Sequence, residues 1–105
     1  MKNFQTTKFQ ERVYSILKKV PKGKVTTYKD ISKVLGKKSY RAVGNALNKN
    51  PYSPQVPCHR VIKSNGEIGG FAFGTKKKIE MLKKEGIRIE KGKIDLEKFS
   101  FQHEH

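Results

Sequence analysis

The chain has 105 residues, a length that suits one compact domain and is too short for two ordinary ones. It holds 24 Lys and Arg against 9 Asp and Glu, for a formal net charge of +15. The electric field of so large a positive charge attracts polyanions, so we expect nucleic acid as the partner. The alternative is that the charge serves only to keep the protein soluble. No apolar run approaches the roughly 20 residues that span a bilayer, so no membrane partner is expected.

The numbers and positions of cysteine and histidine further limit the kinds of protein that the chain can be. A single cysteine excludes an internal disulfide, and it leaves too few ligands for a thiolate-based zinc site. His103 and His105 lie in a polar tail, and we expect neither a metal nor a cofactor. The start of the chain lacks the apolar stretch of a secretory signal. We therefore expect a single-domain monomer over residues 1–105, in the cytoplasm or in a nucleus.

The spacing of apolar residues predicts a first helix over residues 7–20. The apolar side chains on its inner face are Phe9, Val13, Ile16, Leu17 and Val20. Pro21 and Gly23 end this helix. The β-branched segment 25–27 follows, as a small strand or as an extended entry to the next helix.

Two short helices come next. The first begins near Thr27 and Asp30 and ends at Gly36, and the second is capped by Ser39 and runs to Lys49. Their buried residues are predicted to be Ile31, Val34, Leu35, Val43, Ala46 and Leu47. Because a short break separates the two helices, they form a helix-turn-helix pattern. The predicted fold class is mainly α, a winged-helix-like helix-turn-helix domain with small β elements.

The second half of the chain is predicted to contain more turns. Three of the four prolines fall within residues 50–57, which makes this segment an ordered loop. Ser-Asn-Gly at residues 64–66 predicts a hairpin between Val61-Ile62 and Glu67-Ile68. A glycine-rich loop over 69–74 leads to a helix over 75–85. A small hairpin follows within residues 87–96, and residues 98–105 are expected to form a frayed tail.

The segment Pro57-Cys58-His59-Arg60-Val61 carries the clearest chemical signal. A lone cysteine is more often a small buried hydrophobe than a nucleophile. Here a proton acceptor and a cation adjoin it, and such neighbours lower a thiol's pKa and activate the thiolate. Cys58 is therefore predicted to be a nucleophile.

This segment resembles the active-site signature of the O6-alkylguanine-DNA alkyltransferases. Further segments with the same resemblance are Val25-Thr26-Thr27-Tyr28, Arg41-Ala42-Val43-Gly44, Ala46-Leu47, Asn50-Pro51, Gly69-Gly70-Phe71 and Glu85-Gly86. The match covers about residues 7–87 without a gap. The resemblance implies the C-terminal catalytic and DNA-binding domain of that family, with no N-terminal domain before it.

The resemblance also implies an activity. Members of the family transfer an alkyl group irreversibly from O6 of guanine in duplex DNA to their own cysteine, after flipping the base out of the stack. This chain would then be a single-turnover methylated-DNA–protein-cysteine methyltransferase. In it Cys58 is the acceptor, His59 takes the thiol proton through a bridging water, and Glu85 orients His59. Tyr28 protonates the departing guanine, and Asn50 ties the helix pair to the active-site turn.

The second helix of the pair is expected to enter the minor groove, whereas most helix-turn-helix proteins read the major groove. Arg41 would fill the space that the flipped base leaves, and the small residues Ala42, Gly44 and Ala46 would permit close approach. The candidate phosphate contacts are Lys37, Lys38, Lys49 and Lys63, and Ser39 and Tyr28 are further expected to contact the DNA. Without the resemblance, Arg41 is a phosphate contact or a solvated charge, and Tyr28 is a half-buried aromatic residue.

The predicted alkylguanine pocket consists of Tyr28, Val61, Phe71, Ala72 and Phe73. Two of these residues depart from the family pattern. Ala72 stands where some relatives have serine, and Phe73 stands where several have a small residue. Bulk at Phe73 is expected to narrow the pocket and to favour methyl over larger groups.

Three other functions remain open at this point. The first is a non-catalytic lesion-binding protein of the alkyltransferase-like type, whose members lack the cysteine. The second is a helix-turn-helix regulator with an incidental cysteine. The third is a Cys-His hydrolase, which the adjacency of Cys58 and His59 disfavours. Arg60 is expected to be structural, with Glu85 as one possible acidic partner.

Overall fold

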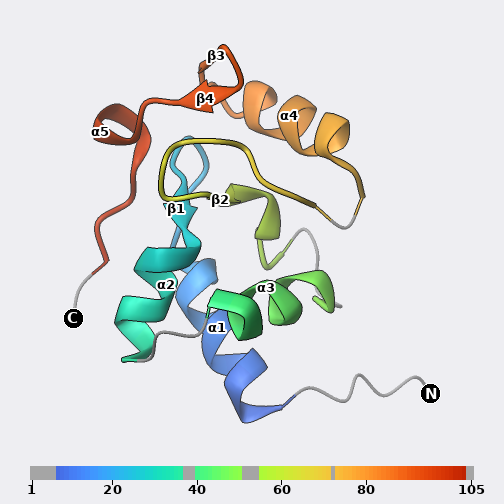
Figure 1. Cartoon of the computed structure of the whole chain (residues 1–105), viewed down its shortest axis with the longest axis vertical. Helices are drawn as coiled ribbons and strands as arrows, with labels where there is room; N and C mark the ends of the chain where they lie inside the picture. The colour runs from blue at the N-terminus through green and yellow to red at the C-terminus, as the bar shows by residue number, and fades with distance from the viewer. Residues whose placement is uncertain (1–6, 37–39, 51–54, 72, 104–105) are drawn as a thin grey trace.

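Three helices pack together in the N-terminal half of the computed structural model, which describes residues 7–36, 40–50, 55–71 and 73–103. They are α1 (Lys8–Lys18), α2 (Tyr28–Leu35) and α3 (Tyr40–Asn48), and they lie together in the lower half of Figure 1. The helix-turn-helix prediction is confirmed by α2 and α3, with Gly36 in the left-handed conformation at the end of α2. Ser39, the predicted cap of α3, lies outside the described residues.

Local sequence signals account for where α1 and α2 begin. The Thr7 side chain accepts a hydrogen bond from the Gln10 backbone, and the Gln10 side chain accepts one from the Thr7 backbone, which is a capping box. Thr27 likewise accepts a bond from the Asp30 backbone at the start of α2.

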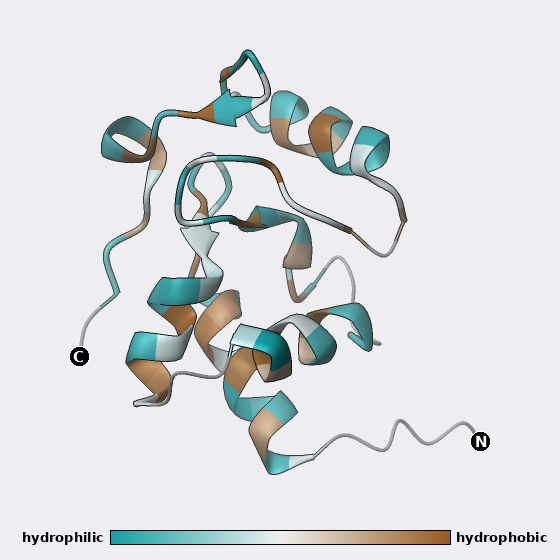
Figure 2. Cartoon of the chain, in the orientation of Figure 1, coloured by the Kyte–Doolittle hydropathy of each residue, from teal (hydrophilic) through white to brown (hydrophobic). Residues whose placement is uncertain are grey.

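The three helices bury one face each, and Figure 2 shows that each carries both hydrophobic and hydrophilic stretches. The core between them consists of Val13, Tyr14, Ile16, Leu17, Val20, Ile31, Leu35, Val43, Ala46, Leu47, Val56, Cys58 and Val61. The Tyr14 hydroxyl donates to the Ala46 carbonyl at 2.7 Å, so α1 is also tied to α3 by a buried hydrogen bond.

A short parallel strand pair joins the two halves of the molecule. Strand β1 (Thr26–Thr27) pairs with β2 (Val61–Ile62), with Thr26 opposite Val61. Strand β2 directly follows the 3₁₀ turn η1 (Cys58–Arg60), and β1 runs directly into α2. The pairing therefore places the start of α2 beside the cysteine-bearing turn.

The predicted hairpin at residues 61–68 is only partly correct. The turn exists, since Lys63 N–H donates to the Glu67 carbonyl at 2.9 Å, but β2 pairs with β1 instead of with Glu67. Glu67 bridges to Lys93, and the Gly66 carbonyl accepts from Ile94 N–H at 2.8 Å. A Cβ on Gly66 would lie 2.8 Å from the Ile94 carbonyl oxygen, so this close approach requires glycine.

The C-terminal half forms a second layer over this junction. It contains α4 (Thr75–Lys84), the antiparallel pair β3 (Ile89–Glu90) and β4 (Lys93–Ile94), and α5 (Leu96–Phe99). The hairpin within 87–96 is thereby confirmed. The core of this layer consists of Val25, Ile62, Ile68, Leu82, Ile87 and Ile94.

The prediction of a frayed tail is wrong for residues 98–103. Val25 N–H donates to the Phe99 carbonyl at 2.9 Å, and Phe101 N–H donates to the Val25 carbonyl at 2.8 Å, so this segment runs alongside β1. Thr26 Oγ1 and His103 Nε2 are 2.8 Å apart. Phe101 packs against the core of the three helices, and the apolar area that it buries offsets the entropy cost of ordering the segment. No helix in the described part of the chain is long and apolar enough to cross a membrane.

Candidate functional site

Residues 56–61, here called the cysteine turn, present Cys58 in a fixed conformation. Pro57 has φ −81° and ψ 71°, and Cys58 N–H donates to the Val56 carbonyl at 2.9 Å, which is an inverse γ-turn. Proline suits that position because its ring restricts φ to about −65°. Arg60 N–H then bonds the Pro57 carbonyl at 2.9 Å, and Val61 N–H bonds the Cys58 carbonyl. The sequence order Pro-Cys-His-Arg-Val thus encodes a rigid turn.

Asn50 connects this turn to the helix pair. It lies just beyond α3, and its Nδ2 donates to the Val56 carbonyl at 2.9 Å. The same carbonyl accepts the Cys58 amide, so the end of α3 and the backbone of Cys58 share one acceptor. The structure thus brings Asn50, which the family resemblance marks as a hinge residue, into contact with the cysteine turn.

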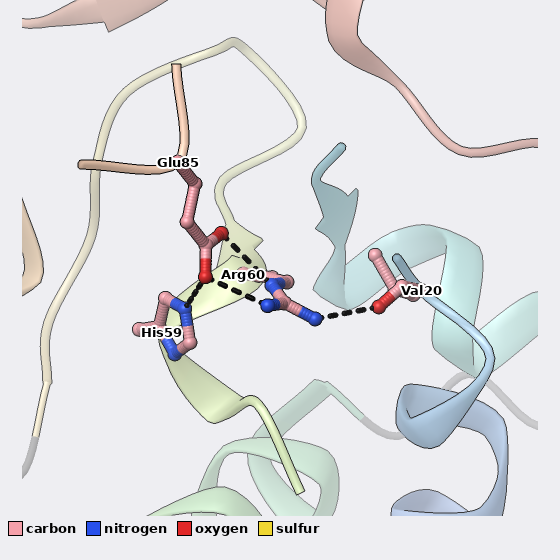
Figure 3. A network of polar contacts seen from close by, with 4 residues as sticks. All are labelled: Val20, His59, Arg60 and Glu85. Atoms are coloured by element: carbon pink, nitrogen blue, oxygen red, sulfur yellow. Dashed lines mark hydrogen bonds and ion pairs between the residues drawn. The ribbon is translucent and has the colours of Figure 1, made fainter. Parts of the chain in front are cut away.

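The side chains of His59, Arg60 and Glu85 meet in one network, drawn in Figure 3. His59 Nε2 lies 2.8 Å from Glu85 Oε2. Arg60 binds the same carboxylate with two nitrogens, Nε to Oε1 at 2.9 Å and Nη2 to Oε2 at 2.7 Å. Its Nη1 donates to the Val20 carbonyl at 2.8 Å, beyond the end of α1. The network therefore joins α1, the cysteine turn and the end of α4.

The charges of this network favour a neutral imidazole beside an ionised carboxylate. Burial acts to raise the pKa of Glu85, but hydrogen bonds and charge from Arg60 and His59 outweigh it and hold that pKa below its usual value. Burial is the largest influence on His59 and lowers the pKa of its imidazole, against the opposing effect of Glu85. Because the carboxylate can only accept, Nε2 carries the proton and Nδ1 keeps a free lone pair. Nδ1 is buried and has no hydrogen-bond partner among the described residues.

An open cleft of about 1010 Å³ lies between the start of α2, one face of α3 and the loop after β2. We call it the α3 cleft. Its lining residues are Tyr28, Lys29, Tyr40, Arg41, Gly44, Asn45, Asn48, Lys63, Ser64, Asn65, Gly69, Gly70 and Phe71. A Cβ on Gly44 would meet nothing within 4 Å, so the small residue leaves space for something outside the chain.

Cys58 lies behind this cleft and does not line it directly. Its side chain belongs to the core of the three helices and the residue is 6% exposed. Tyr28 and Phe71 line the cleft and also pack against that core. Burial, followed by the charge of Cys58, raises the pKa of the Tyr28 hydroxyl, so Tyr28 and Cys58 are close enough to interact. The Tyr28 hydroxyl therefore stays protonated at neutral pH.

The predicted site residues are only partly brought together. Arg41, Gly44, Tyr28 and Phe71 line the α3 cleft, whereas Ala42 and Lys49 do not. Ser39 and Ala72 lie outside the described residues, and Val61 is fully buried.

The expectation that Phe73 narrows the pocket is wrong. Its side chain is 67% exposed and does not line the cleft, and its ring packs edge-to-face against Phe71, with ring centroids 5.4 Å apart. The preference for methyl that was based on Phe73 loses its structural basis.

Sequence reasoning missed two features of the site. The first is a polar stripe on α3, because Asn45 and Asn48 lie one turn and two turns beyond Arg41 on the face lined by the cleft. The spacing i, i+3, i+4, i+7 from Arg41 could have revealed it. The second is Lys78 on α4, which is fully buried although it ends a run of three lysines.

Fold and site together define a helix-turn-helix domain that holds a buried cysteine and histidine, with a partly buried glutamate paired to the histidine, behind an open cleft. Residues 8–87 match the family model described as "6-O-methylguanine DNA methyltransferase, DNA binding domain". The chain belongs to this family.

Known relatives agree with this assignment. The chain is 49% identical over 87 residues to a methylated-DNA–protein-cysteine methyltransferase of Saccharolobus islandicus, a match covering 83% of the chain and 56% of that protein. It resembles the crystal structure of O6-methylguanine-DNA methyltransferase from Pyrococcus kodakaraensis strain KOD1, at 44% identity and a TM-score of 0.72, covering 78% of the chain and 48% of that structure. It therefore spans about half the length of these two relatives.

A third relative matches in length. The crystal structure of S. pombe Atl1 in complex with damaged DNA containing O6-carboxymethylguanine is matched at 29% identity with a TM-score of 0.82. This match covers 95% of the chain and 100% of Atl1.

Proposed function

We propose that this chain reverses DNA damage by transferring an alkyl group from O6 of guanine in duplex DNA to Sγ of Cys58, once per molecule and irreversibly. The observation that carries the proposal is the pairing of His59 Nε2 with Glu85 Oε2 at 2.8 Å, on the turn that holds Cys58. That pairing leaves Nδ1, the second imidazole nitrogen, as a buried acceptor without a partner among the described residues, on the residue next to Cys58 in the chain. No cofactor is needed for this chemistry, and we expect the chain to act as a cytoplasmic monomer.

In the proposed reaction His59 Nδ1 takes the thiol proton through a bridging water. The thiolate attacks the alkyl carbon bound to O6, a C–S bond forms, and the C–O6 bond breaks with its electron pair moving to the guanine. Glu85 stabilises the imidazolium that forms, and Arg60 keeps Glu85 ionised and in place.

Tyr28 is the proposed proton donor to the departing guanine. Its hydroxyl is protonated at neutral pH, and it stands on the side of the α3 cleft that packs against the core containing Cys58. The proton taken from the thiol by His59 and the proton given by Tyr28 leave the overall charge unchanged. Tyr28 recovers its proton from solvent or from His59.

The α3 cleft is the proposed docking surface for DNA, with α3 in the minor groove. Arg41, Asn45 and Asn48 project from one face of α3, and Lys63 lies across the cleft. A guanine must leave the stack to reach a sulfur behind the cleft, and Arg41 would occupy the space it leaves. Phosphate contacts by lysines position the protein without reading sequence, which suits an enzyme that acts on lesions anywhere.

The deciding experiment uses an oligonucleotide duplex that contains O6-methylguanine. The chain is incubated with a stoichiometric amount, and its intact mass and the peptide containing Cys58 are measured. We expect one added methyl group, on Cys58 alone, and unmodified guanine in the product. A matched duplex with ordinary guanine is the control. Methylation of a Cys58→Ala variant, or no mass change with bound lesion DNA, would overturn the proposal.

A second candidate function is lesion binding without transfer. The observation in its favour is the structural match to the whole of Atl1, a protein whose structure holds damaged DNA. Cys58 argues for transfer, because the alternative leaves the Cys58, His59 and Glu85 arrangement without a use. Tight binding to the lesion duplex with no mass gain would establish the second function in place of the first.

The salt dependence of binding tests DNA as the partner independently of chemistry. Counterion release makes the logarithm of the affinity fall linearly with the logarithm of the salt concentration. We expect a steep slope for lesion and for undamaged duplexes, measured by fluorescence anisotropy. A flat response contradicts docking through phosphate contacts.

A further inference from the structure

Tyr40 is an aromatic residue that the proposed reaction does not yet use. It is the first residue of α3 and is 49% exposed. Together with Phe73 it is one of the two large hydrophobic residues that stand exposed in the described part of the chain. A single exposed aromatic side chain is not unusual in itself, so its surroundings decide whether it has a function.

The α3 cleft places Tyr40 among other aromatic residues. Tyr28 and Phe71 also line the cleft, but they are partly buried and pack against the core of the three helices. Their rings are therefore part of the folded wall of the cleft, whereas the ring of Tyr40 stands exposed in it. Of these three rings, that of Tyr40 has the most surface left for a ligand to cover.

The charge of the cleft indicates what kind of ligand this is. Lys29, Arg41 and Lys63 line it, and none of the described residues that line it is acidic. Cationic side chains attract the phosphates of nucleic acid, and an exposed aromatic ring can stack on any nucleobase, because every base has a π-face. A cationic groove that carries an exposed aromatic ring is typical of surfaces that bind unstacked bases.

The position of Tyr40 on α3 indicates where along the DNA its ring would lie. Gly44 is one turn further along the same face, and a Cβ on Gly44 would meet nothing within 4 Å, so the ring stands beside an open stretch of the helix. Arg41 follows Tyr40 in the chain and also lines the cleft. Consecutive side chains of a helix project about 100° apart, so these two would occupy neighbouring places in a stack of bases.

We propose that Tyr40 is a stacking residue, whose ring lies against a base at the step next to the flipped guanine and thereby keeps that step open. This inference rests on the proposed function, in which the α3 cleft receives duplex DNA and Arg41 takes the place of the guanine. Opening a base step costs free energy, and the contact between ring and base offsets part of that cost. Tyr40 thus stabilises the flipped state of the duplex and takes no part in the transfer of the alkyl group.

The first test uses fluorescence, because the chain has no tryptophan and one introduced by substitution reports alone. Stacking on a base quenches the emission of an indole ring. In a Tyr40→Trp variant we expect the emission to fall by at least about half when an O6-methylguanine duplex saturates the protein, since bases stack on an aromatic ring at this position. Saturation is established by the anisotropy of a labelled duplex.

Phe73→Trp is the matched control, since Phe73 is the other exposed ring and does not line the cleft. Its emission should change little with the same duplex. Equal emission of the Tyr40→Trp variant with and without saturating duplex overturns the inference, and so does equal quenching of the two variants.

A second test separates the ring of Tyr40 from its bulk and its hydroxyl. In a Tyr40→Leu variant the second-order rate constant for transfer from the O6-methylguanine duplex should fall by about tenfold, within the range for loss of one stacked base. Tyr40→Phe keeps the ring and should stay within about twofold of the unaltered chain, because stacking does not need the hydroxyl. Transfer from free O6-methylguanine base should be the same in all three proteins. Equal rates on the duplex for Tyr40→Leu and Tyr40→Phe contradict a stacking role.

The inference and the proposed function fail in different ways. Quenching of the Tyr40→Trp variant by a duplex whose methyl group the unaltered chain never accepts would sustain the role of Tyr40 and contradict the proposed transfer. Methyl transfer from the duplex with constant emission of that variant would do the reverse. A chain that binds no duplex at all contradicts both.

Discussion

The cysteine turn and the cleft face of α3 differ in what holds their side chains. His59, Arg60 and Glu85 are bound to one another and to the Val20 carbonyl, all within the chain. Arg41, Asn45 and Asn48 line an open cleft, and Gly44 between them faces empty space. In the first region the side chains are already held by one another, with His59 Nδ1 left as an acceptor, whereas the second presents donors that a ligand must satisfy.

This difference separates chemistry from docking. Groups that transfer protons work best when they are held rigidly, because a fixed geometry lowers the free energy needed to reach the transition state. Groups that receive DNA need room and exposed donors. Substitutions in the cysteine turn should therefore lower the rate of transfer with little effect on affinity, and substitutions on α3 should mainly affect events on the duplex.

The largest expected effect comes from Cys58→Ala. We expect complete loss of methyl acceptance, with affinity for a lesion duplex within a few-fold of the unaltered chain, because Cys58 is 6% exposed and does not line the cleft. Anisotropy titration against the O6-methylguanine duplex measures the affinity. A large loss of affinity in a folded variant would show that the two regions are not separate.

Glu85→Gln should have the next largest effect. The amide keeps the shape but carries no charge, so it loses the ion pair with Arg60 and cannot stabilise the imidazolium that forms at His59. The transfer rate should therefore fall by about 100-fold, the lower range of the effect of a positioned acid or base. Stability should also fall by about 1.5–3 kcal/mol, the usual cost of losing hydrogen bonds to a charged group. Single-turnover kinetics and thermal unfolding measure the two effects.

Glu80→Gln is the control for this substitution, because Glu80 is an exposed residue of the same helix. It should change neither quantity. If Glu85→Gln lowered the melting temperature and left the transfer rate intact, Glu85 would be a structural residue only.

Arg41→Ala should have a smaller and more selective effect. We expect transfer from duplex DNA to slow by about tenfold, equivalent to about 1.4 kcal/mol, because the flipped base loses the side chain that takes its place. Transfer from free O6-methylguanine base should be unchanged. Arg88→Ala removes the same charge outside the α3 cleft and should affect neither substrate. Equal slowing on both substrates by Arg41→Ala would contradict a role in flipping.

Much of this arrangement could be predicted from the sequence. The helices follow from apolar spacing and from caps such as Thr7 and Gly36, and these signals are local. Cys58, His59 and Glu85 could be named because their order in the chain resembles a known family. Their contact could not be predicted, since 25 residues separate His59 from Glu85 and only the packing of α4 on η1 brings them together.

The features that were missed depend on tertiary partners. Lys78 ends a run of lysines that indicates solvent exposure, and only the carbonyls of Val61 and Gly70 explain its burial. The tail offered a weak signal, because Phe99 and Phe101 alternate with polar residues as in a strand. Its partner is the backbone of Val25, more than 70 residues away along the chain, and no local pattern identifies that partner.

The smallest expected effect is a dependence of stability on pH that arises in the cysteine turn. The pKa of His59 is lowered in the folded state, so the unfolded chain binds a proton more readily as the pH falls. The stability due to a neutral His59 is complete above the unfolded pKa of about 6.5 and is lost as the pH falls below it. The melting temperature of the unaltered chain should therefore fall by a few degrees from pH 7 to pH 5.

A His59→Gln variant, measured at the same ionic strength, is the control, and its melting temperature should fall by less over this range. The contribution of Glu85 remains in that variant, and it is lost only at lower pH, where the Glu85 carboxylate becomes protonated. Parallel curves for the two proteins over this range would mean that His59 is not held neutral by its surroundings, and the proton acceptor proposed for the Cys58 thiol would then be in doubt.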